Sequence, residues 1–261
     1  MIGTITAANL AGGTVEPTPV AGYNLWLDAS HAASFTYSSG TVVSQWTDRS
    51  ANAYTFTQAT TANQPTRNTT MNSLSTVQFG ASAAVTNLTA TAAQSTWKYF
   101  HDGTGSTVFF VYRYQTGSGE IGGTKTSNTG IGIQWYPGDA TYRLGMESAN
   151  GTSAQYGGSS TGSGAVNTAS IVTTVQDQTN ATVAQRLLMY LNTGAANTQT
   201  NASMGSPNTG TSTYQFRIGC SPAALNDRMI GEIAEIITYT SILSTINRDA
   251  NITYLKAKWG I

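Results

Sequence analysis

The sequence predicts an all-β fold, a sandwich or barrel of short strands that ends in one helix. Short segments rich in aromatic and β-branched side chains recur along the chain, and clusters of Gly, Asn, Ser and Pro separate them. The 261-residue chain is 39% hydrophobic, which is enough for one sizeable core. In the last segment, by contrast, the apolar residues recur at helical spacing.

The strongest strand prediction is residues 107–114, because aromatic and β-branched residues occupy nearly every position. Pro137-Gly138-Asp139 predicts a turn between strands at 130–136 and 141–147, since proline presets φ and glycine allows a positive φ. The other expected strands cover residues 23–28, 41–46, 54–58, 75–79, 120–122, 169–176, 185–191, 214–219 and 229–239.

The two ends of the chain differ from the region between them. Residues 1–21 are predicted to form an extended arm, because their X-Pro pairs favour extended backbone. Residues 22–261 are predicted to form a single sandwich domain. Ser244 is a good helix N-cap, apolar residues follow it at helical spacing, and Gly260 can end the helix.

Charge is scarce and balanced in this chain. Charged residues make up 9% of it, with 12 Lys and Arg against 12 Asp and Glu. Binding to nucleic acid or to an anionic membrane needs a positively charged surface, so we expect neither partner. Cys220 is the only cysteine, which rules out an internal disulfide. Residues 1–20 contain no Lys or Arg and no long apolar run, so we expect no signal peptide.

Segments at both ends of the chain resemble a known family. Leu25-Trp26-Leu27-Asp28-Ala29-Ser30, the segment 43–50 and Ala62-Asn63-Gln64-Pro65-Thr66 resemble the opening of bacterial and phage domains of the concanavalin A-like and laminin-G-like type. Residues 217–219 and 230–239 are similar to the last core strands of that family, and 243–260 to its terminal helix. The resemblance covers most of residues 22–261. It implies an antiparallel jelly-roll β-sandwich (concanavalin A-like) with a short C-terminal helix.

Domains of this family serve as carbohydrate-binding modules, adhesin parts or phage structural modules, and fold alone does not choose among them. Our main hypothesis is a non-enzymatic phage virion structural protein, either a capsid decoration protein or a fibre-type module. It would be made in the host cytoplasm without a signal peptide and exposed on the virion surface. The arm at 1–21 would contact other virion proteins, and we expect a homo-oligomer. The alternative is a lectin-like or adhesin module that binds carbohydrate, such as a host-surface glycan.

Aromatic residues at or near the predicted loops are the candidate carbohydrate-binding residues. Exposed rings can stack on the faces of sugar rings, while neighbouring polar groups bind the hydroxyls. The candidates are Trp135, Tyr136, Tyr142 and Tyr156, of which Trp135 could instead belong to the core.

Glu232 and Glu235 are candidates for a pair of catalytic carboxylates, as in sandwich-fold glycosidases. Residues three apart on a regular strand point to opposite faces. In addition, position 234 is Ala, where the glycosidases of this family carry Asp. We therefore expect structural roles for both, with Arg217 or Arg49 pairing with Glu235. We predict that the chain has no catalytic residues and is not an enzyme.

Two further motif matches have simple structural explanations. Residues 150–167 and 192–213 are predicted to be long polar loops, and 158–162 in the first of them match G-x-S-x-G. That motif needs a strand before it and a helix after it, so we interpret it as part of the loop. Residues 117–122 match G-x-G-x-x-G, but a strand follows instead of a helix, which favours a hairpin turn.

No metal or cofactor site is predicted. A calcium site needs about six or more oxygen ligands, and the aspartates of this chain form no dense array. Backbone oxygens could still complete such a site, so a structural calcium ion stays open. The scattered acids that could contribute are Asp28, Asp48, Asp102, Asp139, Asp177 and Asp227.

Overall fold

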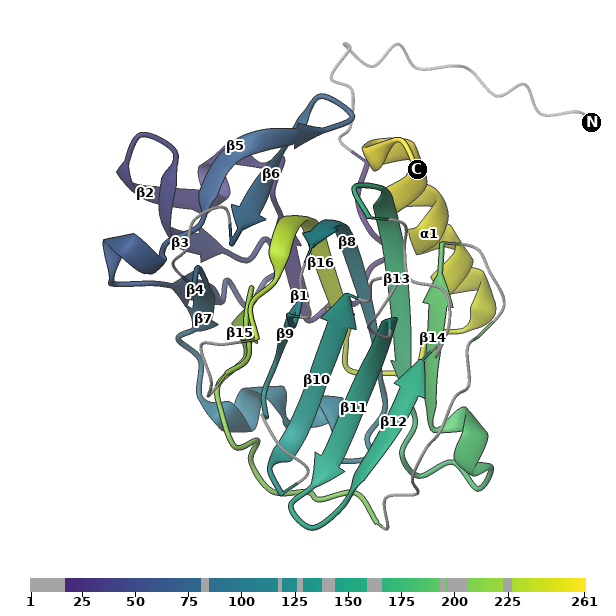
Figure 1. The fold of residues 1–261 in the computed structure, drawn as a ribbon. Helices are drawn as coiled ribbons and strands as arrows, with labels where there is room; N and C mark the ends of the chain where they lie inside the picture. The colour runs from purple at the N-terminus through teal and green to yellow at the C-terminus, as the bar shows by residue number, and fades with distance from the viewer. Residues whose placement is uncertain are drawn as a thin grey trace, which may run out of the picture.

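A computed structural model describes residues 17–80, 85–116, 119–125, 129–137, 144–158, 166–192, 196, 206–222 and 227–261. Its strands join into one continuous, antiparallel, 16-stranded sheet that bends back on itself to form two layers (Figure 1). With helix α1 (Thr245–Trp259), this arrangement confirms the predicted all-β sandwich with a short C-terminal helix. Among the described helices, none is long and apolar enough to cross a membrane.

One layer, here called the front sheet, consists of five strands next to one another in the sheet order. They are β12 (Ala154–Gly158), β11 (Leu144–Asn150), β10 (Ile131–Pro137), β9 (Gly122–Gly123) and β15 (Arg217–Ile218).

The second layer, here called the back sheet, also has five strands. They are β1 (Leu25–Asp28), β16 (Ile230–Tyr239), β8 (Ser106–Thr116), β13 (Ala169–Gln176) and β14 (Leu187–Leu191).

The remaining strands continue the sheet from one layer to the other. They are β7 (Leu88–Ala90), β4 (Thr55–Thr57), β3 (Val42–Thr47), β2 (Phe35–Ser39), β5 (Thr66–Met71) and β6 (Leu74–Phe79). Short 3-10 helices lie in the connections, namely η1 (Ala32–Ser34), η2 (Thr61–Asn63), η3 (Gln94–Phe100) and η4 (Val183–Gln185).

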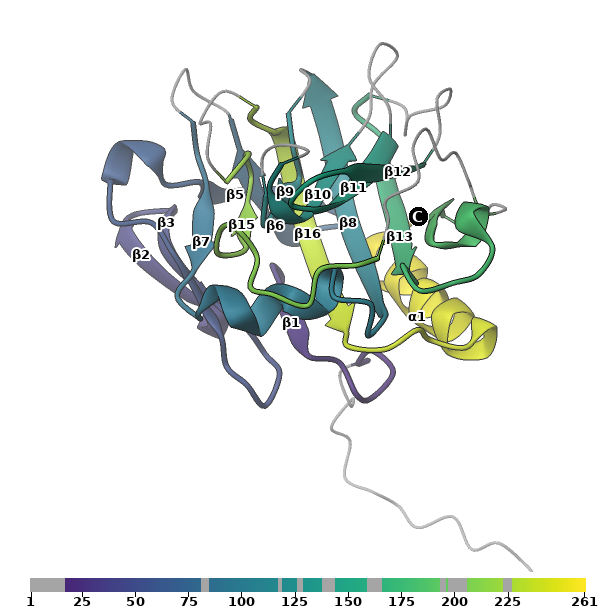
Figure 2. The same cartoon turned by 90° about the horizontal axis from the view of Figure 1, so that it is seen from below.

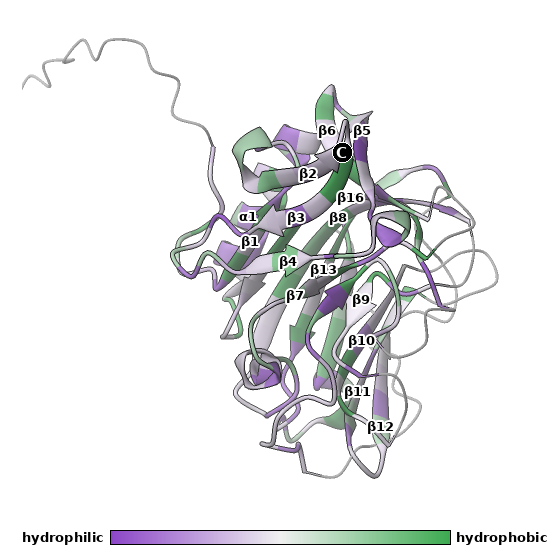
Figure 3. Ribbon diagram, turned by 90° about the vertical axis from the view of Figure 1, so that its left-hand side faces the viewer, coloured by the Kyte–Doolittle hydropathy of each residue, from purple (hydrophilic) through white to green (hydrophobic). Residues whose placement is uncertain are grey.

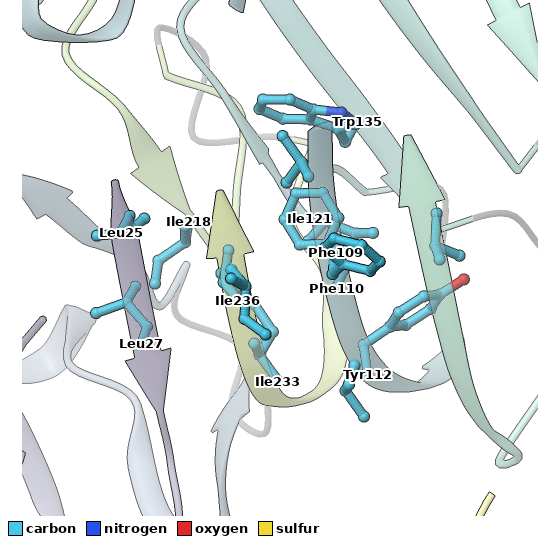
Figure 4. Close-up of a cluster of buried hydrophobic side chains, with 14 of the residues drawn as sticks. Leu25, Leu27, Phe109, Phe110, Tyr112, Ile121, Trp135, Ile218, Ile233 and Ile236 are labelled. Carbon is cyan, nitrogen blue, oxygen red and sulfur yellow. The ribbon is translucent and has the colours of Figure 1, made fainter. Parts of the chain in front are cut away.

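The main core lies between the two sheets, where Figure 4 shows side chains from both layers meeting. The Trp135 ring from the front sheet packs edge-on against Phe110 of the back sheet, with 5.3 Å between ring centroids. It also packs against Phe100 of η3 at 5.0 Å. Hydrophobic positions of β8 and β16 supply much of this interior (Figure 3). The sandwich is therefore held by apolar burial, and its largest fully buried side chains are aromatic.

Helix α1 lies against the side of the back sheet that faces away from the front sheet (Figure 2). It begins and ends as predicted. The Ser244 hydroxyl accepts a hydrogen bond from the backbone N–H of Asn247, and Gly260 ends the helix with a φ of 71°. The end of the predicted arm is bound to the same helix, because the Val20 N–H donates to the Asn251 side chain at 2.9 Å. Residues 1–16 lie outside the described part of the chain.

A buried carboxylate joins the helix to the sheet. Glu235 of β16 is fully buried and accepts hydrogen bonds from the indole N–H groups of Trp26 at 2.6 Å and Trp259 at 2.7 Å. It also accepts from the Tyr254 hydroxyl at 2.8 Å, and the Lys258 ammonium lies 3.0 Å away. The donors come from β1 and α1, so one side chain links three elements. Its expected partners, Arg217 and Arg49, are replaced by Lys258.

Asp28 of β1 extends this buried charge cluster. The Lys258 ammonium lies 2.8 Å from its carboxylate, and the Arg49 guanidinium lies 2.6 Å away. Burial alone would raise the pKa of Asp28, but Lys258, Ser30 and Arg49 lower it overall. The pKa of Glu235 is raised, because its burial outweighs the stabilising charge of Lys258. Asp28 of β1 and Glu235 of β16 therefore both serve helix docking, since each contacts Lys258 of α1.

We expect Glu235→Ala to lower the free energy of unfolding by about 3–5 kcal/mol, the usual cost of removing one partner from a buried ion pair. The substitution leaves two buried indole N–H groups without their acceptor and removes one of the two carboxylates that face the Lys258 ammonium. Urea unfolding measured by circular dichroism tests this expectation. Asp249→Ala on the exposed side of α1 is the control and should change stability by less than about 1 kcal/mol. A similarly small loss for Glu235→Ala would contradict this role.

Candidate functional site

The front sheet carries a row of polar side chains on the face that points away from the core. In the strand register, Gln134 of β10 lies opposite Glu147 of β11, and Glu147 lies opposite Tyr156 of β12. Side chains alternate along a strand, so Gln134 and Tyr136 share the outer face, while Trp135 between them points into the core. The sheet thus places an amide, a carboxylate and two phenols on one surface.

Gln134 connects the members of this group. Its amide N–H₂ donates to Glu120 Oε1 at 2.5 Å. Its amide oxygen accepts from the Lys125 ammonium at 2.6 Å and from the Tyr136 hydroxyl at 3.3 Å. Lys125 also forms an ion pair with Glu147. These five residues and Tyr156 are called the front-sheet cluster below.

Glycine makes room for this cluster on β9. Gly123 lies opposite Gln134 in the ladder, where a Cβ would come within 2.7 Å of the Ile133 carbonyl oxygen and 3.2 Å of Gln134 Cγ. A larger residue at this position would displace the Gln134 side chain. The absence of a side chain at 123 therefore allows β9 to pair closely with β10 beside Gln134.

The cluster is unusual because several of its ionisable groups are buried. Glu120 is 1% exposed, Lys125 is fully buried and Glu147 is 6% exposed. Burial, reinforced by Asp227, raises the pKa of Glu120 to about 9, despite the nearby Lys125 charge. Burial also lowers the pKa of Lys125, against the pull of Glu147. Perturbed groups of this kind gather at functional sites more often than elsewhere, which makes this face the candidate site.

The four predicted carbohydrate-binding residues have different locations. Tyr136 and Tyr156 are partly exposed, and both belong to the front-sheet cluster. The expectation that Trp135 is exposed is wrong, because its ring is fully buried and its indole N–H donates to Thr174 at 3.2 Å. Its position in β10, directly between two outward-facing residues, forces it inward. Tyr142 lies outside the described residues.

Sequence reasoning missed the polar members of the site, which are Glu120, Lys125, Gln134 and Glu147. The alternation of Ile133, Gln134, Trp135 and Tyr136 does carry a signal, since it places Gln134 beside Tyr136 on a face opposite two apolar residues. The strand β12 also lies within the segment predicted to be a loop at 150–167. Its sequence, Ala-Gln-Tyr-Gly-Gly, lacks β-branched residues, and its pairing with β11 makes it a strand.

The expectation that Glu232 and Glu235 point to opposite faces of their strand is wrong. Both nevertheless have structural partners. The register of β16 against β8 shifts between Ile233 and Glu235, which places an extra residue, Ala234, in the strand. Glu232 consequently lies opposite Arg113 and Glu235 opposite Val111, two positions on the same face of β8. Glu232 pairs with the Arg113 guanidinium at 2.7 Å, and Glu235 is enclosed by α1.

Two of the acids considered for calcium have other partners. Asp28 pairs with two cations, as described above, and Asp48 accepts from the backbone N–H groups of Trp26 at 2.6 Å and Ser50 at 2.8 Å. Asp139 lies outside the described residues. Within the described ranges, no three acids, histidines or cysteines gather in a way that could hold a metal ion.

No family model matches the chain, and no curated protein matches it. Solved structures do share its fold. The binding domain of botulinum neurotoxin serotype G aligns with a TM-score of 0.55 at 12% identity, over 90% of this chain and 51% of that one. The binding domain of Paraclostridial mosquitocidal protein 1 gives 0.55 at 11% identity, over 90% and 52%. A Trypanosoma rangeli sialidase gives 0.52 at 12% identity, over 92% of this chain and 34% of the sialidase.

This chain therefore spans about a third to a half of the length of these proteins. At such low identity the likeness shows a common fold. It supports the β-sandwich part of the predicted resemblance.

The raised pKa of Glu120 gives a stability prediction. A folded-state pKa of about 9 means that the native protein keeps a proton which the unfolded chain releases above its own pKa of 4.5. The contribution of Glu120 to stability therefore falls as the pH rises from about 4.5 to 9, and then levels off.

Glu120→Gln removes this titration while keeping the shape of the side chain. We expect the free energy of unfolding of the variant, minus that of the wild type, to increase steadily between about pH 5 and 9. Urea unfolding of both proteins across this range measures the difference. A constant difference would show that Glu120 does not titrate differently in the folded state.

Proposed function

We propose that this protein is a carbohydrate-binding module and that the front-sheet cluster is its binding site. The observation that carries the proposal is the arrangement of Tyr136 and Tyr156 beside Gln134 and Glu147 on one outer face. Sugars present apolar ring faces and many hydroxyl groups. A site for them needs aromatic surface next to precisely placed polar groups, which is what this face offers.

The rigidity of the cluster supports the proposal. Its polar groups are fixed by strand register and by contacts with one another, so few of them need to be ordered when a ligand binds. Preorganisation of this kind lowers the entropic cost of association. The tyrosines retain partial exposure at the edge of a network that is otherwise buried. They are the residues that a ligand would meet first.

The shared fold is consistent with this role. Two of the similar structures are described as binding domains, and one is a sialidase. Of the two hypotheses from the sequence, the front-sheet cluster thus favours the alternative, a module that binds carbohydrate. A structural role in a virion, with the arm at 1–21 as the contact, stays a prediction, because the contacts expected for it lie largely in residues 1–16.

Glycan-array binding by the full chain tests the proposal. We expect binding to a restricted set of glycans. Tyr136→Ala and Tyr156→Ala should each weaken this binding by at least about tenfold, because each removes about 1.4 kcal/mol of contact energy. Tyr190→Ala is the matched control, because Tyr190 is also partly exposed but contacts Arg248 of α1.

The control variant should bind as the wild type does. Circular dichroism spectra and thermal melts must show that each variant is folded. Binding to no glycan at all, or binding that survives both cluster substitutions, would overturn the proposal.

A further inference from the structure

Glu120 of the front-sheet cluster has a buried carboxyl oxygen whose role is not explained by glycan binding to the tyrosines alone. Its Oε1 accepts from Gln134, but its Oε2 is buried and has no hydrogen-bond partner in the described part of the structure. Nearly all buried polar atoms in proteins are paired, and leaving one unpaired costs about 1–3 kcal/mol. A ligand bound at this face can therefore form the hydrogen bond that Oε2 lacks.

The protonation state of Glu120 decides what that ligand atom must be. Because burial raises its pKa to about 9, Glu120 is a neutral acid near pH 7. Its Oε1 already accepts a hydrogen bond, so the proton belongs on Oε2, which becomes a donor. The complementary ligand atom is an acceptor oxygen, such as that of a hydroxyl, ring ether or amide carbonyl.

The charges around Glu120 balance one another. Lys125 is paired with Glu147, so the buried part of the site has no net charge when Glu120 is neutral. At its edge, Asp227 and Arg228 carry opposite charges, and the backbone of both pairs with Glu120. Tyr136, Tyr156 and Cys220 are further titratable groups near the site, with Arg217 beside Cys220, and burial raises the pKa of Tyr136 and of Cys220. A charged ligand would bring an uncompensated charge to this buried cluster, which costs far more than placing neutral hydroxyls there.

We infer that the front-sheet cluster selects uncharged sugars and that Glu120, as a neutral acid, donates a hydrogen bond from Oε2 to an oxygen of the ligand. This inference rests on the proposed carbohydrate-binding function and specifies its ligand class. It also assigns to Glu120 a contact role that is separate from those of Tyr136 and Tyr156. Gln134 holds the carboxyl group in place for that contact.

The first experiment uses the full chain on an array with two groups of glycans. One group ends in galactose, N-acetylglucosamine or mannose, and the other in sialic acid, a uronic acid or a sulfated sugar. We expect binding to be confined to the uncharged group. A preference for the acidic group would overturn the inference but leave carbohydrate binding intact, whereas binding to neither group would remove the proposed function itself.

The second experiment titrates the tightest uncharged glycan against pH by calorimetry, using the wild type and Glu120→Gln. Gln keeps a neutral donor at the position of Oε2, so the variant should bind within about threefold of the wild type near pH 7. Above its pKa, Glu120 loses its proton and becomes an acceptor. The affinity of the wild type should therefore fall about tenfold by about pH 10, while that of the variant stays unchanged.

Glu120→Ala should weaken binding by at least about tenfold at neutral pH, because it removes the donor. Circular dichroism at each pH confirms that all three proteins are folded. Identical pH profiles for the wild type and Glu120→Gln would overturn the inference, because Glu120 would not be the titrating group. Loss of binding by folded Glu120→Gln near pH 7 would overturn it as well.

Discussion

The two-residue repeat of strand β10 is the constraint on which both the core and the candidate site depend. Trp135 points inward and meets aromatic side chains of the back sheet and of η3. Gln134 and Tyr136, one position to either side, must then point outward. A shift of register by one residue would turn the indole ring to the outer face and the amide and the phenol toward the core, so the large apolar burial of Trp135 fixes the chemistry of the opposite face. The candidate site is in this sense a consequence of how the sandwich is packed.

Several of the few charged residues in this chain are buried and paired with one another. Glu235 and Asp28 face Lys258 and Arg49 beneath α1, while Glu147 faces Lys125 on the front sheet. Buried ion pairs add little net stability compared with apolar packing, but an unpaired member is strongly destabilising. Each buried ion pair therefore favours the fold in which the two elements that carry its partners lie in contact. Glu235 beneath α1 accepts hydrogen bonds at both carboxyl oxygens, whereas Glu120 on the front sheet has one carboxyl oxygen without a hydrogen-bond partner among the described residues.

Local patterns in the sequence predict most of the architecture. The run at 107–114 predicts β8, and Ser244 with Gly260 predicts both ends of α1, because caps and β-branched runs act through neighbouring residues. The bulge at Ala234 and the strand β12 are not predictable in this way, since both arise from pairing with a distant strand.

The candidate site is predicted only in part, for a related reason. Proximity to a loop selects Trp135 and Tyr136 equally, although strand alternation places them on opposite faces. Glu120 and Lys125 flank β9 and meet Gln134 only through the pairing of β9 with β10, so no local pattern in the sequence reveals their contacts. Spacing along the chain identifies elements, while the site depends on which elements lie next to one another.

Hydrogen–deuterium exchange with and without a bound glycan tests the central claim most directly, because it locates the ligand without any substitution. Binding at the front-sheet cluster predicts slower exchange in the peptides that contain β9, β10, β11 and β12. Exchange in α1 and in the strands β2 and β3 should be unchanged. Protection confined to those distant elements, with none in β9–β12, would contradict the claim that this outer face is the binding site.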